Sequence, residues 1–167
     1  NVDAIDATLT QLFTAVGDIA SDENKPRLHA LLALGTDLLA VEIALGLGWQ
    51  VSAPLPFGRS LNVAINAQPQ TVDEARALLE RGGECREPAR SNAVKISEAA
   101  EQVTCFELAE RDDQITHLFF DALQTPAMPA AVHAFGVATS ERAALAGQVM
   151  IEQIDLLVAV WDGHSPG

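Results

Sequence analysis

The chain has 167 residues, 49% of them hydrophobic and 20% charged, which suits one globular domain with a sizeable core. Its net charge of −13 at pH 7, with only ten Lys and Arg residues, argues against nucleic acid and anionic membrane surfaces as partners. No run of apolar residues approaches the roughly 18 that a membrane-spanning helix needs.

Cysteine usage and the two ends of the chain set further expectations. Cys85 and Cys105, twenty residues apart, form neither a disulfide framework nor a zinc motif, so we expect a cytoplasmic protein. The chain begins with Asn1 rather than Met, and its last predicted strand lies only a few residues before Gly167. We therefore expect a single domain, 1–167, that is incomplete at both ends.

Helical and strand patterns alternate in the first third of the chain. Apolar residues at helical spacing predict an amphipathic helix over 3–20. A short apolar run predicts a strand over 28–34, and Thr36 or Asp37 can cap a helix that runs to about residue 47. A second strand is predicted over 49–53, which completes a strand–helix–strand unit of parallel type.

The middle of the chain has weaker patterns. Residues 54–70 are predicted to be a long loop, 71–81 a short helix, and 84–100 a polar loop with a helical turn. A third strand is predicted over 103–108, and a helix over 112–123.

The end of the chain carries the strongest strand signal. A last helix, capped by Thr139, leads directly into residues 155–160, where five consecutive apolar residues predict a strand buried on both faces. Alternating helices and apolar strands predict an α/β fold. We expect a three-layer sandwich in which helices cover both faces of a mostly parallel sheet.

Three segments follow predicted strands, and ligands bind at such positions in parallel sheets. They are Gly35-Thr36-Asp37, Pro54-Leu55-Pro56-Phe57-Gly58-Arg59 and Trp161-Asp162-Gly163. Because parallel strands end at the same edge, we expect the three segments to converge in space. This edge is the predicted ligand site.

The residue types at these positions suit a nucleotide. Gly35 lets backbone approach an anion at a helix N-terminus, and Thr36 and Asp37 can bond to hydroxyl groups. Phe57 or Trp161 can stack on a base, and Arg59 can pair with a phosphate. Each feature also has a structural alternative: a tight turn for Gly35, a helix cap for Asp37, core packing for Trp161 and a solvated side chain for Arg59. The candidate ligand residues are Gly35, Thr36, Asp37, Pro56, Phe57, Arg59, Trp161, Asp162 and Gly163.

Signals for catalysis are weak. The four histidines belong to no metal-ligand motif, so we expect no metal site, and no serine has the context of a nucleophile elbow. The acidic pair Glu107 and Glu110 is predicted to be a solvated face. Whether the chain is an enzyme stays open at this point.

Two segments carry a family resemblance. Gly35-Thr36-Asp37-Leu38-Leu39-Ala40-Val41-Glu42, with Ala44, Gly48 and Leu55-Pro56-Phe57, resembles the Gly-Ala-Asp to Leu-Pro-Phe segment of the SLOG superfamily. Ala146-Gly147 and Asp155-Leu156-Leu157-Val158-Ala159-Val160-Trp161-Asp162-Gly163 are similar to the family's Ala-Gly and Ala-Val-Trp-Asp-Gly segment. The superfamily includes the cytokinin-activating LOG proteins and the DNA-processing protein DprA.

The resemblance implies a Rossmann-like domain that binds a nucleotide or a nucleotide derivative. It favours a sensor module of a bacterial signalling or conflict system, with a LOG-like enzyme that hydrolyses a nucleoside N-glycosidic bond as the alternative. It implies no cofactor other than such a nucleotide, and it leaves open whether the chain forms a homo-oligomer.

Overall fold

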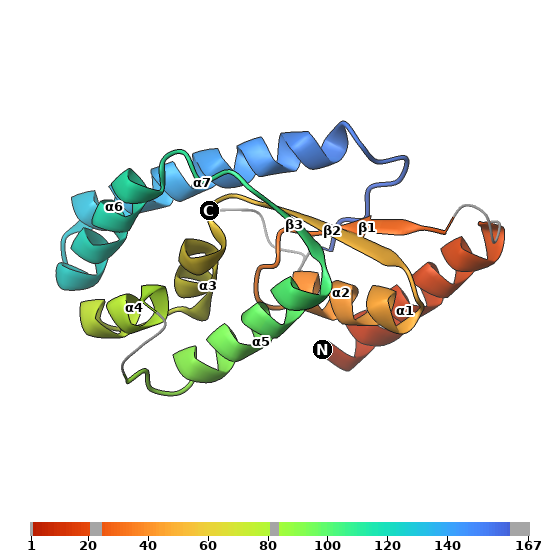
Figure 1. Cartoon of the computed structure of the whole chain (residues 1–167), viewed down its shortest axis with the longest axis horizontal. Helices are drawn as coiled ribbons and strands as arrows, with labels where there is room; N and C mark the ends of the chain where they lie inside the picture. The colour runs from red at the N-terminus through yellow and green to blue at the C-terminus, as the bar shows by residue number, and fades with distance from the viewer. Residues whose placement is uncertain (1, 21–24, 81–83, 161–167) are drawn as a thin grey trace.

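The computed structural model describes residues 2–20, 25–80 and 84–160. One or more helices separate the described strands along the chain, as Figure 1 shows. In chain order they are α1 (Val2–Ile19), β1 (Arg27–His29), α2 (Thr36–Gly46), β2 (Gln50–Leu55), α3 (Arg59–Ala67), α4 (Val72–Leu79), α5 (Ala89–Gln102), β3 (Thr104–Glu107), α6 (Asp112–Gln124) and α7 (Pro129–Ile151).

The described strands form one parallel sheet in the order β1-β2-β3, which confirms an α/β fold with a parallel sheet. In the register, His29 pairs with Ser52, and Leu55 pairs with Glu107. The three predicted strands over 28–34, 49–53 and 103–108 therefore exist, although the first is shorter than predicted.

Pro54 lies inside the central strand, where a missing N–H would ordinarily remove a ladder hydrogen bond. Alternate residues of a parallel strand direct their polar groups to opposite neighbours. Ser52 accepts a bond from Ala30 on the β1 side, and Leu55 accepts one from Leu108 on the β3 side. Pro54 therefore faces the β1 side, beyond the last residue of β1, so its missing N–H does not interrupt the pairing of β2 with β3.

Two apolar clusters hold the elements together. The larger joins α1, α2, α3 and α5 to the sheet around fully buried side chains such as Leu32, Val41, Leu55 and Ile96. The smaller joins α3, α4 and α6 around Phe57, Leu61, Ala64, Ala75, Ile115 and Phe119. In Figure 1, α7 crosses above the strands while α2 and α5 lie below them.

Trp49 packs at the amino edge of the sheet. Its ring stacks on Phe13 of α1, with ring centroids 4.9 Å apart, and the indole also lies beside Gly17 of the same helix. This is the role of a packing residue.

The prediction of a strand over 155–160 is wrong. The structure has no strand there, and the large side chains of Leu156, Leu157, Val158 and Val160 are 41–64% exposed. Consecutive apolar residues produce a buried strand only where a neighbouring strand and two covering layers receive them. None of the described strands pairs with this segment.

Two segments predicted as loops are helical. Residues 54–70 contain α3, which is only nine residues long, about two and a half turns, so it offers a short stretch of helical pattern. Residues 84–100 contain most of α5, whose buried face consists of Ala89, Ala93, Ile96, Ala99 and Ala100. Alanine is only weakly apolar, so the periodic signal of this helix is faint.

The last helix is longer than predicted, because it begins at Pro129 and not at Thr139. Gly136 does not end it, since one glycine inside a helix costs only about 1 kcal/mol relative to alanine. The hydroxyl of Thr139 donates to the carbonyls of Phe135 and Gly136, as mid-helix threonines do, and does not act as a cap.

Helix α4 begins with a capping arrangement that involves a distant arginine. The Thr71 hydroxyl accepts the N–H of Glu74 at 3.3 Å, and Glu74 accepts the N–H of Gln70 at 2.9 Å. Arg86 donates to the other oxygen of Glu74 at 2.6 Å. The Arg86 hydrogen bond, with the Gln70 N–H second, lowers the pKa of Glu74 to about 2.

This lowered pKa predicts a loss of stability in acid. The unfolded chain takes up a proton on Glu74 near pH 4.5, whereas the folded chain does so near pH 2. The stability that this carboxylate contributes is therefore complete above about pH 4.5 and is lost as the pH falls towards 2. Urea unfolding from pH 7 to pH 3 should show a smaller acid loss for Glu74→Gln than for the wild type. Glu98→Gln, at an exposed position of α5, should follow the wild type, and equal losses in all three would contradict this assignment.

Candidate functional site at the carboxyl edge of the sheet

The N-terminus of α2 follows β1 after the loop of residues 30–35 and has no capping side chain. Gly35 precedes it with φ of 91°, a backbone conformation that residues other than glycine rarely adopt. A Cβ built on Gly35 would have no atom within 4 Å, so the space beside this backbone is open. The first turn of α2 therefore offers backbone N–H groups and the positive end of its dipole to an anion.

Asp37 holds the loop that precedes α2. One carboxylate oxygen accepts the N–H groups of Leu31 at 3.1 Å and Ala33 at 3.3 Å. Leu32, between them, has φ of 57° and a fully buried side chain. The carboxylate thus keeps a strained, buried residue in place, which is more than a helix cap does.

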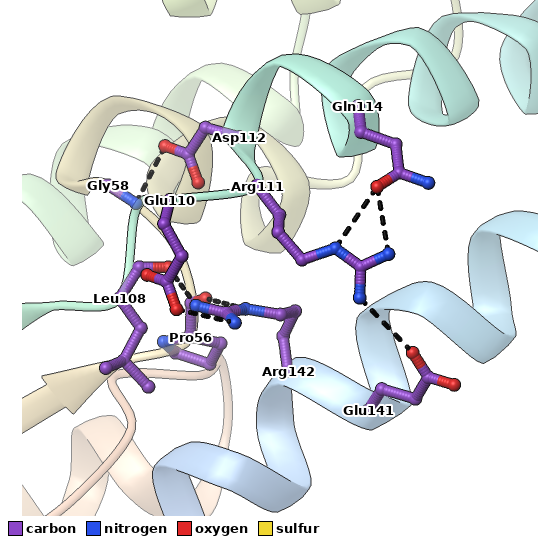
Figure 2. Close-up of polar contacts among 9 residues, drawn as sticks. All are labelled: Pro56, Gly58, Leu108, Glu110, Arg111, Asp112, Gln114, Glu141 and Arg142. Carbon is purple, nitrogen blue, oxygen red and sulfur yellow. Dashed lines mark hydrogen bonds and ion pairs between the residues drawn. The ribbon is translucent and has the colours of Figure 1, made fainter.

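The N-terminus of α3, after β2, is already occupied by two carboxylates of the same chain. Asp112 accepts the N–H of Gly58 at 2.9 Å, as Figure 2 shows, and Glu107 accepts the N–H of Arg59 at 3.0 Å. The Arg59 guanidinium lies 3.8 Å from Glu107, and both side chains are partly exposed. An incoming anion would have to displace these carboxylates.

Asp112 has one carboxylate oxygen in contact with Gly58 and a second, buried oxygen with no hydrogen-bond partner among the described residues. Burial raises the pKa of Asp112, and the Gly58 N–H only partly opposes this effect. A carboxyl group with a raised pKa at the carboxyl edge of a sheet is a candidate acid or base.

Arg142 connects α7 to the loops after β2 and β3. Figure 2 shows its guanidinium between these loops: it donates to the carbonyl of Pro56 at 3.2 Å, to the carbonyl of Leu108, and to Glu110 at 3.0 Å. Arg142 is only 5% exposed. Its hydrogen bond lowers the pKa of Glu110. Glu107 and Glu110 are both exposed, as predicted for a solvated acidic face, but each also has a specific partner, Arg59 for Glu107 and Arg142 for Glu110.

The structure brings some of the predicted ligand residues together and gives others a different role. Gly35, Thr36 and Asp37 lie at the same edge as Pro56 and Arg59, because β1 and β2 are parallel neighbours. Phe57 lies at this edge as well, but its ring is 3% exposed and packs in the smaller apolar cluster. Trp161, Asp162 and Gly163 lie outside the described residues.

Of the two cysteines, Cys105 on β3 interacts with Arg59 near this edge, whereas Cys85 lies in the segment before α5. The cysteines are unpaired, and burial raises the pKa of both thiols. No group of three His, Cys, Asp or Glu side chains within residues 2–20, 25–80 and 84–160 could hold a metal ion. In the same residues, no helix is both long enough and apolar enough to cross a membrane.

Sequence patterns did not reveal Asp112 or Arg142. Asp112 stands beside Asp113 at the start of a helix, where acidic residues usually serve the helix dipole. Arg142 lies four residues before the fully buried Ala146, hence on the same face of α7. A charged residue on the buried face of an Ala-rich helix is the signal that could have identified it.

Comparison of the chain with family models, curated proteins and solved structures found no match.

Gly58 and Asp112 should be energetically coupled. A Cβ on Gly58 would stand 2.5 Å from the Asp112 carboxylate, so Gly58→Ala should displace it and cost about 2 kcal/mol. Asp112→Ala, which removes the acceptor of the Gly58 N–H, should cost about 1 kcal/mol. The double variant should cost no more than Gly58→Ala alone, because the clash no longer exists. Urea unfolding of all four proteins measures this, and additive losses would contradict it.

Proposed function

We propose that the chain binds a nucleotide or a nucleotide derivative at the carboxyl edge of the sheet, as a sensor module of a bacterial signalling or conflict system. The parallel α/β fold is compatible with the Rossmann-like, three-layer domain that the SLOG resemblance implies. In such domains the phosphate of the ligand lies at a helix N-terminus that follows a strand.

The observation that carries the proposal is the difference between the two helix N-termini at this edge. The start of α3 is closed by Asp112 and Glu107, whereas the start of α2 has no capping side chain and an open space beside Gly35. We therefore place the phosphate at α2, with its oxygens bound by the first-turn N–H groups and the Thr36 hydroxyl. Asp37 holds the loop before this helix N-terminus in place, because its carboxylate accepts the N–H groups of Leu31 and Ala33.

A thermal-shift experiment with NAD and with nucleoside mono- and diphosphates tests the proposal. A ligand present at about 100 times its dissociation constant should add roughly 2.7 kcal/mol to the free energy of unfolding. Thr36→Val should weaken binding about tenfold, because it replaces the hydroxyl by a methyl group and keeps the size of the side chain. Thr139→Val, inside α7, is the matched control and should leave affinity unchanged.

The absence of a shift with every nucleotide would contradict the proposed function. Binding that Thr36→Val leaves intact would place the site elsewhere than α2.

One observation favours hydrolysis as a second candidate. The carboxylates of Asp112 and Glu107 converge on Gly58, and burial raises the pKa of Asp112. A carboxyl group that keeps its proton can donate it to a leaving base while a second carboxylate activates water, the division of roles seen in glycoside hydrolysis. Release of free base from nucleoside monophosphates, abolished by Asp112→Asn, would support an enzyme. Binding without any release would support the sensor.

A further inference from the structure

A groove of about 650 Å³ lies between α4 and α5, which both pack against α3. Its apolar lining comes from Val63 of α3, Ala77 and Leu78 of α4, and Ala93 of α5. Val94, on the α5 side, is 49% exposed. None of the residues placed in the proposed nucleotide site lines this groove.

Helix α5 presents a regular stripe to the groove. Arg90, Val94, Ser97 and Glu101 all line it, and they follow one another at intervals of four, three and four residues. This is the spacing of the contact positions in a two-helix coiled coil. Arg90, Val94 and Glu101 are exposed, and Ser97 is half-buried and small enough for close approach.

The charges of this stripe run against the dipole of their own helix. The first turn of α5 has no acidic residue and contains Arg90, while its last turn has no basic residue and contains Glu101. A helix dipole favours the opposite arrangement. Neither Arg90 nor Glu101 forms an ion pair with any described residue. An antiparallel helix beside α5 would favour both charges. The negative C-terminal end of its dipole would lie near Arg90, and the positive N-terminal end would lie near Glu101.

We propose that this surface, the α5 groove, binds a second copy of the chain, with the two α5 helices antiparallel about a twofold axis. The midpoint of Ala89–Gln102 is also the midpoint between Arg90 and Glu101 and between Val94 and Ser97. A twofold axis at this point pairs Arg90 with Glu101 of the partner subunit, and Val94 with Ser97 of the partner subunit. The stripe is therefore self-complementary, as an interface between identical subunits requires.

The groove also fits this arrangement. Each α5 would lie over the gap between α4 and α5 of the other subunit, so the apolar lining of both grooves becomes covered. We expect an interface of one helix pair and its grooves to bury less than the roughly 800 Å² per partner of a standard stable complex. We also expect the dimer to dissociate in the micromolar range.

Sedimentation velocity of the full chain from 1 to 200 μM tests the proposal. Physiological salt screens the repulsion between two chains of net charge −13 beyond about 8 Å. The wild type should dimerise. Arg90→Glu and Glu101→Arg should each raise the dissociation constant at least tenfold, because each places two like-charged pairs in the interface. The double variant, Arg90→Glu with Glu101→Arg, should restore dimerisation, because it restores both pairs with reversed polarity.

Both positions are exposed, so the variants should keep the circular-dichroism spectrum and thermal unfolding of the wild type, which separates loss of the interface from loss of the fold. A wild type that stays monomeric at 200 μM would overturn the proposal. So would a double variant that dimerises no better than the single ones, because the contacts would then lie elsewhere.

Discussion

Replacing Arg142 with alanine should lower the free energy of unfolding by about 3–5 kcal/mol. The change leaves the carbonyls of Pro56 and Leu108 without their donor at a buried position and removes the link between α7 and the carboxyl edge of the sheet. Glu110 contributes little to this loss, because its side chain is 62% exposed and water can replace the arginine there. Chemical denaturation with urea measures the effect.

Arg111 provides the matched control, since Figure 2 shows it beside Arg142 with partners of its own. Its guanidinium bonds to Gln114 and lies 3.7 Å from Glu141, but both members of that ion pair are exposed. Arg111→Ala should therefore cost less than about 1 kcal/mol. Arg142→Lys should fall between the two, because an ammonium group keeps the charge but cannot reach three acceptors as a planar fork does. Equal losses for Arg111→Ala and Arg142→Ala would show that the buried network contributes no more than a surface pair.

Asp37→Ala should cost about 2–3 kcal/mol, clearly more than the loss of a helix cap, which is about 1 kcal/mol. The Asp37 carboxylate accepts two N–H groups on either side of the buried, left-handed Leu32. Asp37→Asn should cost about 1 kcal/mol, because an amide oxygen still accepts both bonds but without the charge that strengthens them. Urea unfolding of the three proteins gives these values.

Glu42→Ala is the control for Asp37, since it changes an exposed carboxylate of the same helix, and it should stay within about 0.5 kcal/mol of the wild type. If Asp37→Ala unfolded like the wild type but bound nucleotides more weakly, Asp37 would be a ligand residue and the loop would not depend on it. If it lost stability and kept its affinity per folded molecule, the support of the loop would be its only role.

Residue patterns alone predicted the parts of the fold that depend on local chemistry. Apolar runs bounded by turn residues predicted the three strands of the sheet, and Thr36 and Asp37 predicted a helix start within two residues of the observed one, although the N-cap is Gly35 and neither of these side chains caps the helix. These predictions succeed because strand formation and helix starts depend on the residues themselves and their nearest neighbours. The parallel arrangement followed from the helices between the strands. This arrangement places Gly35, Thr36, Asp37, Pro56 and Arg59 at one edge of the sheet.

Only the tertiary structure decided which groups at that edge are free. The sequence cannot show that Asp112 and Glu107 close the start of α3, or that Arg142 reaches the Pro56 carbonyl, because these contacts join residues 48 to 86 positions apart. The apolar pattern of residues 155–160 also predicted a buried strand, although the large side chains of this segment are exposed in the structure. Apolar character is a property of the segment, whereas burial, pairing and hydrogen-bond satisfaction depend on which distant partners the fold brings to it.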